Sequence, residues 1–277
     1  MKPELRTLIT DIKAAARIGH AESLWMALDG LLGLPEVAGN PQMSETFISQ
    51  AILPIGEVLS QPRLSLSLLR PLTNEPTAAI RAIAAAAFAK RFLAGGDAKE
   101  QDLRGLGQDP RKDVRQALTL ALASADQTDK LQPLVDSWLK DSSPRLRTAA
   151  IQLLPTLPEY TFEALEGLKI ESDPEIRAAV VDTLTALAQN GNADKVLALL
   201  EQWVDVQENN VWVITKTLSG SWAAGEADKA LAVLGKLTAH AGPHKHINSA
   251  LKALERHGAV EQVRAALGQW AQNKDKN

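Results

Sequence analysis

Apolar residues recur every three or four positions along nearly the whole chain, which is the spacing of one face of an α-helix. Val180, Val181, Leu184 and Leu187 form one such series. Glycine and proline interrupt the pattern at short intervals and leave helical segments of roughly 10 to 18 residues between them. No stretch alternates apolar and polar residues between turn signals, as a half-buried strand would. The sequence therefore predicts an all-α protein built of short helices.

A short motif recurs four times in the middle of the chain, at residues 75–84, 109–118, 141–150 and 171–180. An acidic residue is followed by a turn, and an arginine stands six residues after the acid, at the start of a helix that reads AIRAIA, DVRQAL, RLRTAA or EIRAAV. The acid–arginine pairs are Glu75 and Arg81, Asp109 and Arg115, Asp141 and Arg147, and Glu171 and Arg177. This periodicity predicts stacked helix pairs, each of which buries its apolar face only against its neighbours.

We interpret the acid–arginine pairs as structural rather than catalytic. An arginine in the first turn of the second helix of a pair can reach an acid in the same or the neighbouring repeat. A ladder of such contacts would set the register between repeats. Two weaker copies of the motif follow, in which Trp212 and then Asn248 take the place of the arginine.

The motif resembles HEAT repeats over roughly residues 61–257. This resemblance implies a right-handed α-α superhelix of about six helix pairs. In that family the second helices line a concave face, which usually binds a protein or a nucleic acid. We expect one continuous domain, with capping helices in residues 1–60 and a capping helix and tail in residues 258–277.

The capping segments also carry a helical pattern. Before the repeats, helices are expected near residues 3–17, 21–32 and 43–59, and Pro54 is expected to kink or break the last of these. After the repeats, a final helix is expected near residues 259–272. These segments would cover the ends of the stack.

Tryptophan is frequent among the aromatic residues, with six Trp against four Phe and one Tyr. Trp138 and Trp203 occupy matching places near the ends of first helices, so we interpret them as structural cover for a helix end. The segment 138–150, which begins at Trp138, also resembles repeats of bacterial DNA alkylation-repair glycosylases. That resemblance does not extend to the catalytic Asp of that family, so it assigns no catalytic residue to this chain.

Three residues are the candidate binding site. Trp212 and Trp222 are expected in one second helix, where Trp212 would project into the concave groove and stack on a base or on a partner side chain. Lys216 stands one helical turn after Trp212 and completes the candidate set. The alternative is that Trp212 only fills the gap left by the missing arginine.

Charge changes the choice of partner. The chain has 30 Lys and Arg against 33 Asp and Glu, a formal net charge of −3, which argues against a surface built to hold phosphates. Residues 158–211 are strongly acidic, whereas both flanks are mildly basic. We assign the positions one and five residues after each repeat arginine to the groove, and none of them is basic. Stacking of the repeats could still bring three basic residues outside these positions, Arg104, Arg111 and Lys112, together on an edge.

Other chemistry finds no support in the sequence. Cysteine is absent, which excludes disulfides and thiolate sites. We expect no cofactor and no metal, because the pair His244 and His246 has the wrong spacing for two ligands on one helix face. Nucleotide-binding loops and nucleophile elbows are absent as well. No secretory signal begins the chain and no apolar run is long enough to span a membrane, so we expect a cytoplasmic protein.

Together these features favour a non-enzymatic scaffold that binds a macromolecular partner on its concave face. A protein is the expected partner. The alternative is a DNA-binding protein of the alkylation-repair type, acting as a glycosylase or lesion sensor. The frequent tryptophans favour that alternative, and the charge disfavours it.

Overall fold

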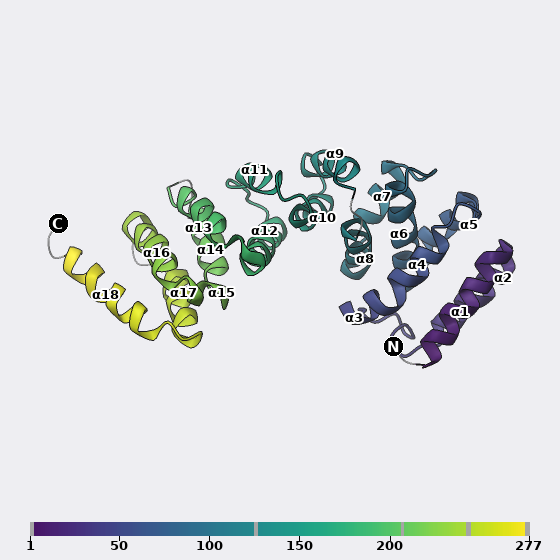
Figure 1. The fold of residues 1–277 in the computed structure, drawn as a ribbon, viewed down its shortest axis with the longest axis horizontal. Helices are drawn as coiled ribbons and strands as arrows, with labels where there is room; N and C mark the ends of the chain where they lie inside the picture. The colour runs from purple at the N-terminus through teal and green to yellow at the C-terminus, as the bar shows by residue number, and fades with distance from the viewer. Residues whose placement is uncertain (1–2, 125–126, 206–207, 242–244, 275–277) are drawn as a thin grey trace. The chain divides into compact units, whose positions relative to one another are not determined.

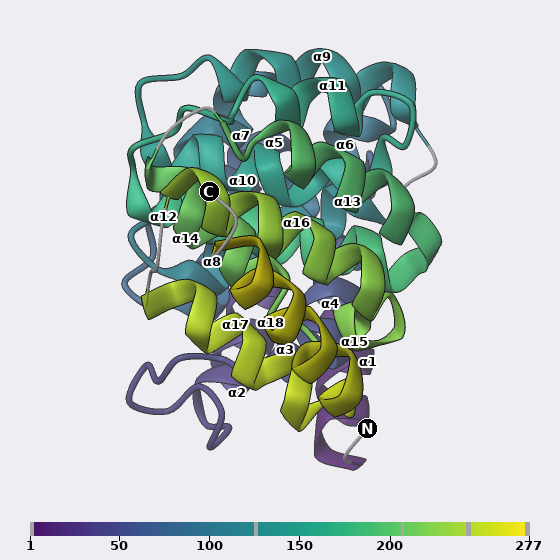
Figure 2. The same ribbon diagram turned by 90° about the vertical axis from the view of Figure 1, so that its left-hand side faces the viewer.

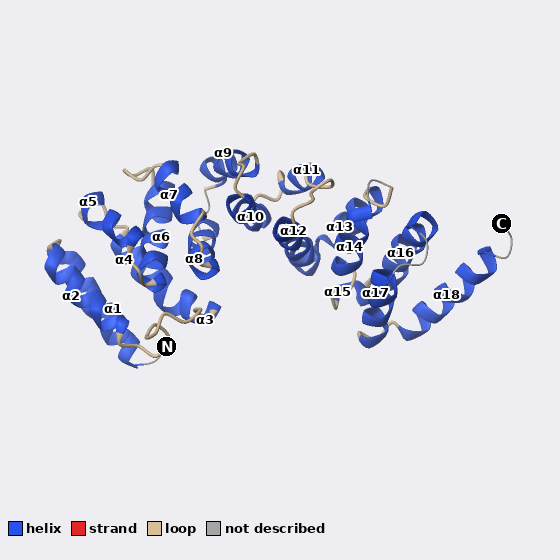
Figure 3. Cartoon of the chain, turned by 180° about the vertical axis from the view of Figure 1, so that it is seen from behind, coloured by secondary structure: helices blue, strands red, loops and turns tan. Residues whose placement is uncertain are grey.

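A computed structural model describes residues 3–124, 127–205, 208–241 and 245–274 (Figure 1). The described secondary structure is entirely helical, and no strand occurs in these four ranges (Figure 3). This confirms the all-α prediction. The described helices include none that is long and apolar enough to cross a membrane.

The chain divides into two compact units, Met1–Thr156 and Leu157–Asn277, which we call the first and the second unit. The helices of the first unit are α1 (Pro3–Ile18), α2 (Ala21–Leu32), α3 (Glu45–Phe47), α4 (Leu53–Leu59), α5 (Leu66–Leu69), α6 (Ala78–Leu93), α7 (Glu100–Gly107), α8 (Lys112–Ala123), α9 (Thr128–Leu139) and α10 (Pro144–Leu153). A π-helical segment (Ile48–Ile52) precedes α4, and 3-10 segments follow α5 (Arg70–Asn74) and α10 (Leu154–Thr156).

The second unit repeats this organisation. Its helices are α11 (Thr161–Glu166), α12 (Pro174–Leu187), α13 (Ala193–Gln202), α14 (Glu208–Thr217), α15 (Trp222–Gly225), α16 (Ala227–Ala241), α17 (Lys245–Arg256) and α18 (Val260–Lys274). A kink at Ala188–Asn192 joins α12 to α13, because Asn190 and Gly191 leave helical geometry there and Gly191 adopts a positive φ of 88°. The expected final helix is therefore present as α18, and residues 275–277 of the tail lie outside the described residues.

Each unit is a stack of two helical layers. In the first unit α4, α6, α8 and α10 pack in succession, and we call them its second-helix layer, with α7 and α9 drawn above them in Figure 1. In the second unit α12, α14 and α17 pack in succession as the second-helix layer, and α11, α13 and α16 form the first-helix layer above them. This stacking of helix pairs is the arrangement that the repeat motif predicts.

The core of the first unit is densest around α6. Helix α6 is rich in alanine, and nearly all of its side chains are buried between α4, α8 and α7. Gly56 of α4 lies directly against α6, because a Cβ at Gly56 would come within 2.4 Å of the Ala86 Cβ and 3.1 Å of the Ala87 backbone nitrogen. Small residues on both helices therefore allow this close packing.

Pro54 does not break the helical run that the sequence predicts near residues 43–59. The chain stays helical from Glu45 to Leu59, and the π-helical segment ends directly before α4. The Leu53 N–H donates to the Ile48 carbonyl five residues earlier. Pro54 then falls in the first turn of α4, where its missing N–H is tolerated.

A loop lies along the N-terminal ends of α6 and α8, and we call residues 33–44 the strap. The Asn40 Oδ1 accepts a hydrogen bond from the Ala78 N–H at 3.0 Å, so the strap caps α6. The Met43 N–H donates to the Asp113 Oδ2 at 2.9 Å, and the Arg111 Nη1 donates to the Asn40 carbonyl at 3.0 Å. The Asn40–Ala78 contact spans 38 positions of the sequence, and the other two span 70 and 71.

The second unit ends in α17 and α18, which lie side by side (Figure 2). Trp270 of α18 packs against Gly235 of α16, since a Cβ at Gly235 would lie 2.9 Å from the indole Nε1. Val263 is the buried anchor in the first half of α18. Most other side chains of α18 are exposed, so this helix covers the stack loosely.

Candidate interaction surface

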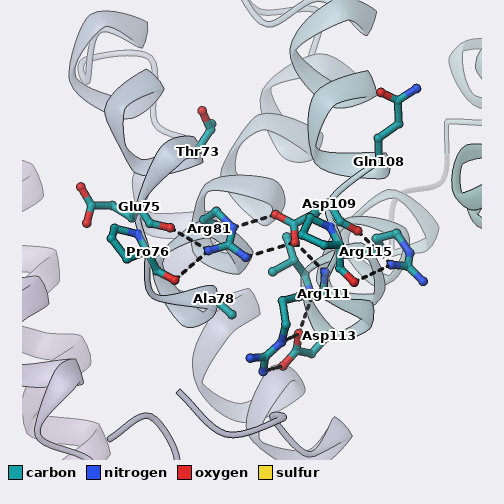
Figure 4. Close-up of polar contacts among 12 residues, drawn as sticks. Thr73, Glu75, Pro76, Ala78, Arg81, Gln108, Asp109, Arg111, Asp113 and Arg115 are labelled. Atoms are coloured by element: carbon teal, nitrogen blue, oxygen red, sulfur yellow. Dashed lines mark hydrogen bonds and ion pairs between the residues drawn. The ribbon is translucent and has the colours of Figure 1, made fainter. Parts of the chain in front are cut away.

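Two repeat arginines of the first unit, Arg81 and Arg115, bind the backbone of their own turn. The Arg81 Nη1 donates to the carbonyls of Glu75, at 2.7 Å, and Pro76, at 2.9 Å (Figure 4). Arg115 repeats this contact with the carbonyls of Asp109, at 2.8 Å, and Pro110, at 3.3 Å. The six-residue offset therefore matches the reach of the guanidinium, which extends back to the carbonyl of the residue six positions before it. The turn carbonyls, rather than the acid at that offset, are the partners.

Arg81 also reaches the acid of the next repeat. Its Nε donates to the Asp109 Oδ2 at 2.7 Å, and its Nη2 donates to Oδ1 at 3.2 Å (Figure 4). Both side chains are largely shielded from solvent, with 13% of Arg81 and 7% of Asp109 exposed. This two-point contact ties one repeat to the next and is stronger than a surface ion pair.

Three of the four repeat acids, Asp109, Asp141 and Glu171, accept a hydrogen bond from the turn that follows them. The Asp109 Oδ1 accepts the Arg111 N–H at 2.8 Å, the Asp141 Oδ1 accepts the Ser143 N–H at 2.7 Å, and the Glu171 Oε1 accepts the Asp173 N–H at 2.9 Å. In each case the donor lies two residues after the acid, so the acid organises the turn before the helix begins. The recurring acid is thus a local structural requirement.

The predicted basic edge of Arg104, Arg111 and Lys112 does not form a free cluster. Arg104 pairs with Asp141 and lies 3.6 Å from a Glu100 carboxylate oxygen. The Arg111 Nη2 lies 2.7 Å from the Asp113 Oδ2 (Figure 4), and only Lys112 of the three is fully exposed. The two arginines are therefore already paired with acids of the chain.

Asp113 is the most buried carboxylate of this network, with 1% of its side chain exposed. Burial alone would raise the pKa of Asp113, but hydrogen bonds from Arg111 and from the Met43 N–H outweigh burial and lower it. The Asp113 hydrogen bond in turn raises the pKa of Arg111. Both groups are therefore charged at neutral pH and hold the strap on α8.

The positions one and five residues after each repeat arginine do not form one exposed surface, contrary to the sequence prediction. Buried positions among them are Ala82, Ala86, Thr148, Val213 and Thr217. A second helix contacts second helices on both sides and a first helix behind, so most of its circumference is covered. The absence of basic residues at these positions therefore does not describe the charge of the exposed face.

Trp138 and Trp203 are core residues. Trp138 lies in the last turn of α9 and is fully buried, and Trp203 directly follows α13 with 1% exposed. The Trp203 Nε1 donates to the Glu166 Oε2 of α11 at 3.0 Å. Hydrogen bonds from Lys169 and then Trp203 lower the pKa of Glu166. Neither indole is placed to contact a nucleotide.

Trp212 and Trp222 do not share a helix, contrary to the sequence prediction. Helix α14 ends at Thr217, and Trp222 begins the separate helix α15. Gly220 lies in the turn between them, where a Cβ would come within 2.8 Å of the Trp222 ring. The helix is therefore interrupted between the two tryptophans, and Gly220 packs against the Trp222 ring in the turn.

The surroundings of the two indoles also differ. Trp212 is half-buried, and the guanidinium carbon of Arg177 lies 5.9 Å from its ring centroid. One face of this ring is therefore occupied by the repeat arginine of the preceding repeat, as a cation–π contact. Trp222 is half-buried, and its Nε1 is buried with no hydrogen-bond partner among the described residues. Lys216 is exposed, one turn after Trp212 on α14.

Further exposed cations lie on the neighbouring helix α17. Lys245, Lys252 and Arg256 are spaced at i, i+7 and i+11 and share one exposed helix face. A shallow depression of about 380 Å³ beside them is lined by Ser249, Lys252, Glu255 and Arg256. Sequence reasoning missed these three cations, although their spacing in the last repeat could have revealed them. We call Lys216, Lys245, Lys252 and Arg256 the cation face.

The described residues contain no group of three or more His, Cys, Asp or Glu side chains placed to hold a metal ion. His244, one of the two histidines weighed as metal ligands from the sequence, lies outside the described residues.

Comparison with known proteins supports the repeat assignment. Residues 65–155 match the family model of HEAT repeats, which confirms the resemblance for that part of the chain. A search of curated proteins found no match. Among solved structures, the crystal structure of an engineered protein from the Northeast Structural Genomics Consortium matches this chain, with 16% sequence identity. That match covers 98% of this chain and 96% of the other, with a TM-score of 0.25.

Proposed function

We propose that this chain, whose residues 65–155 are HEAT repeats, is a non-enzymatic scaffold that binds a protein partner along its second-helix layers. HEAT repeats typically mediate protein binding, and stacked helices present an extended surface for recognition. The proposal includes a cytoplasmic location and no cofactor. DNA is the alternative partner.

One observation carries the proposal. Contacts between repeats recur at separations of 35 to 37 residues, as in Ser137 to Glu100, Trp203 to Glu166 and Lys229 to Asp194. These contacts lie between first helices and fix the register of the stack from that side. Exposed side chains of the second helices, among them Lys216, are left for a partner. We therefore place the binding residues at Trp212, Lys216 and Trp222.

A site-specific cross-link tests this function. The photoreactive residue benzoylphenylalanine is introduced in place of Lys216 on α14, and in a control in place of Lys236 on α16 of the first-helix layer. We expect a covalent adduct with a protein from the Lys216 position and little or none from the Lys236 position after illumination in cells. Equal adducts at both positions, or adducts only at Lys236, would contradict the proposed surface. An adduct removed by nuclease would favour the DNA alternative.

A further inference from the structure

We propose that the cation face binds an acidic polypeptide segment. This inference rests on the proposed function and specifies the chemistry of the partner. The four cations come from two helices of the second-helix layer that pack against each other, Lys216 from α14 and Lys245, Lys252 and Arg256 from α17 (Figure 1).

The first observation is how the other cations of the second unit are paired. Lys229 lies 2.6 Å from an Asp194 carboxylate oxygen, Lys236 pairs with Glu201, and Lys169 lies 2.6 Å from Glu166. The Lys195 Nζ lies 5.6 Å from the Phe162 ring centroid, and Arg264 lies 3.0 Å from Glu261. Cations around the first-helix layer and on α18 are therefore used within the chain.

The cation face differs. Among the described residues, no carboxylate lies within ion-pair distance of its four members, and the Arg256 Nε donates only to the Lys252 carbonyl of its own helix. All four side chains are exposed. In a unit where Lys169, Lys195, Lys229 and Lys236 have partners within the chain, this face is left for an outside anion.

The position of Lys245 is the second observation. Lys245 is the first residue of α17, and the first turn of α17 contains no acid. A cation at a helix N-terminus is unfavourable, because the helix dipole is positive at that end. Helix stability therefore does not explain Lys245, whereas contact with an acidic ligand does. Arg256 and Lys216 stand in last turns, where the dipole also favours them, so Lys245 is the most informative member.

The dimensions fit a short segment. Lys245 and Arg256 are eleven residues apart on one helix, a distance of roughly 16 Å at 1.5 Å per residue. About five residues of an extended peptide span that distance. Ser249 lies on the same face and Asn248 beside it, both exposed and able to hydrogen-bond a peptide backbone.

A nucleic acid fits less well. Four cations would neutralise few phosphates, whereas specific DNA binding relies on many such contacts. Glu175 and Asp182 are exposed on α12, which packs against α14, and they would repel a long polyanion that continued along the layer. The cation–π contact with Arg177 also occupies one face of Trp212, the indole available for stacking on a base.

The test measures binding of a fluorescein-labelled poly-glutamate peptide of about ten residues to the full chain, by fluorescence anisotropy. The double variant K245E/K252E removes two cations of the face. The matched control K229E/K236E makes the same charge change on two exposed lysines of α16. A duplex DNA of about 20 base pairs is titrated in parallel, at low and near-physiological salt.

We expect the peptide to bind the wild-type chain with an affinity that falls as salt rises. K245E/K252E should weaken binding at least about tenfold, whereas K229E/K236E should change it less than about threefold. No peptide binding at low salt, or an equal loss in both variants, would overturn the inference. DNA binding that is tighter than peptide binding and depends on the same lysines would also overturn it.

The cross-link and the peptide titration together distinguish failure of the inference alone from failure of the proposed function. If the cross-link from Lys216 traps a protein while the peptide fails to bind, the scaffold function stands and the acidic-segment inference is wrong. If the peptide binds the cation face while cross-linked adducts form only from Lys236, the scaffold surface is wrong and the peptide result reflects charge alone. That second outcome also removes the basis of the inference.

Discussion

Arg81 in the first unit and Arg177 in the second occupy the same place in the repeat, six residues after an acid, but they meet different partners. Arg81 makes a two-point contact with Asp109 of the next repeat, largely shielded from solvent. Arg177 lies over the ring of Trp212, the residue at the arginine place of the next repeat. The sequence has Val206, not an acid, six residues before Trp212. The cation–π contact thus replaces the carboxylate where the motif has lost it.

The units also differ in how neighbouring repeats are held. Hydrogen bonds of Arg81 and Asp113 that are shielded from solvent join segments of the first unit. In the second unit, the Trp203–Glu166 hydrogen bond and exposed lysine–carboxylate pairs between α13 and α16 join neighbouring repeats. Exposed pairs contribute little, because water and salt screen them. The shielded contacts of Arg81 and Asp113 are therefore expected to contribute more to stability than the exposed pairs between α13 and α16. The second unit also carries the cation face.

The largest expected effect comes from breaking the arginine contact in the first unit. Asp109→Ala leaves the shielded Arg81 without its carboxylate and the Arg111 N–H without its acceptor, so we expect a loss of about 3–5 kcal/mol. Hydrogen exchange measured over each unit would report this loss in the first unit. The control Asp182→Ala, on the exposed face of α12, should stay within about 0.5 kcal/mol. Similar effects of both substitutions would contradict the ladder.

The next largest effect is expected from disturbing the close packing of α4 against α6. Gly56→Ala would place a methyl group against Ala86, and we expect it to destabilise the first unit by about 1–3 kcal/mol in urea denaturation. Gly105→Ala in α7 meets no atom within 4 Å and should stabilise by up to about 1 kcal/mol, from helix propensity alone. A stabilising Gly56→Ala would show that α4 and α6 are not in close contact.

Lowering the pH should reduce the stability of the first unit more than that of the second. The lowered pKa of Asp113 means that its carboxylate stabilises the fold above the unfolded-state pKa, and that this stabilisation is lost as pH falls through the folded-state value. The pKa of Glu166 is lowered in the same direction, but 38% of its side chain is exposed, so its contribution is smaller. We expect hydrogen exchange of the first unit to rise below about pH 4.

The variant Asp113→Asn identifies the group responsible for this acid response. It should be less stable than the wild type at neutral pH and should lose less stability on acidification. An unchanged pH dependence in Asp113→Asn would assign the acid response to other carboxylates.

The smallest effect concerns the replacement contact in the second unit. Arg177→Ala removes the cation above Trp212, and we expect a loss of about 0.5–1 kcal/mol. Arg177→Lys keeps a cation and should retain most of the stability. Thermal unfolding followed by tryptophan fluorescence would compare the two variants. A loss as large as that of Asp109→Ala would show that both units depend on their repeat arginines equally.

The repeat architecture was predictable because its signal is local. Glu75, Asp109 and their arginines stand at fixed offsets, and the turn geometry explains that offset in the structure. The exposed faces were less predictable. Sequence reasoning places Ala82 and Val213 in the groove, but packing from several neighbours buries them. Hydrophobic periodicity gives the buried side of one helix and does not show how many neighbours cover it.

Two features of the candidate site depended on contacts that a motif does not encode. The break between Trp212 and Trp222 follows from Gly220 lying under an indole, although an isolated glycine is compatible with a continued helix. The strap brings Asn40 and Met43 to Arg111 and Asp113, with no recurring pattern in its own sequence. The strap contacts join residues about 70 positions apart, so they can be recognised only once the fold brings these residues together.

The strap has a consequence for how the first unit folds. Its hydrogen bonds with Arg111 and Asp113 close loops of about 70 residues, twice the separation of the contacts between repeats. Loop-closure entropy grows only logarithmically with length, so this doubling costs roughly 0.6 kcal/mol more than one repeat-to-repeat contact. A single charge-assisted hydrogen bond such as Met43 to Asp113 offsets that cost. The chain can therefore fasten its N-terminal segment two repeats away at almost the entropic cost of contacting the next repeat.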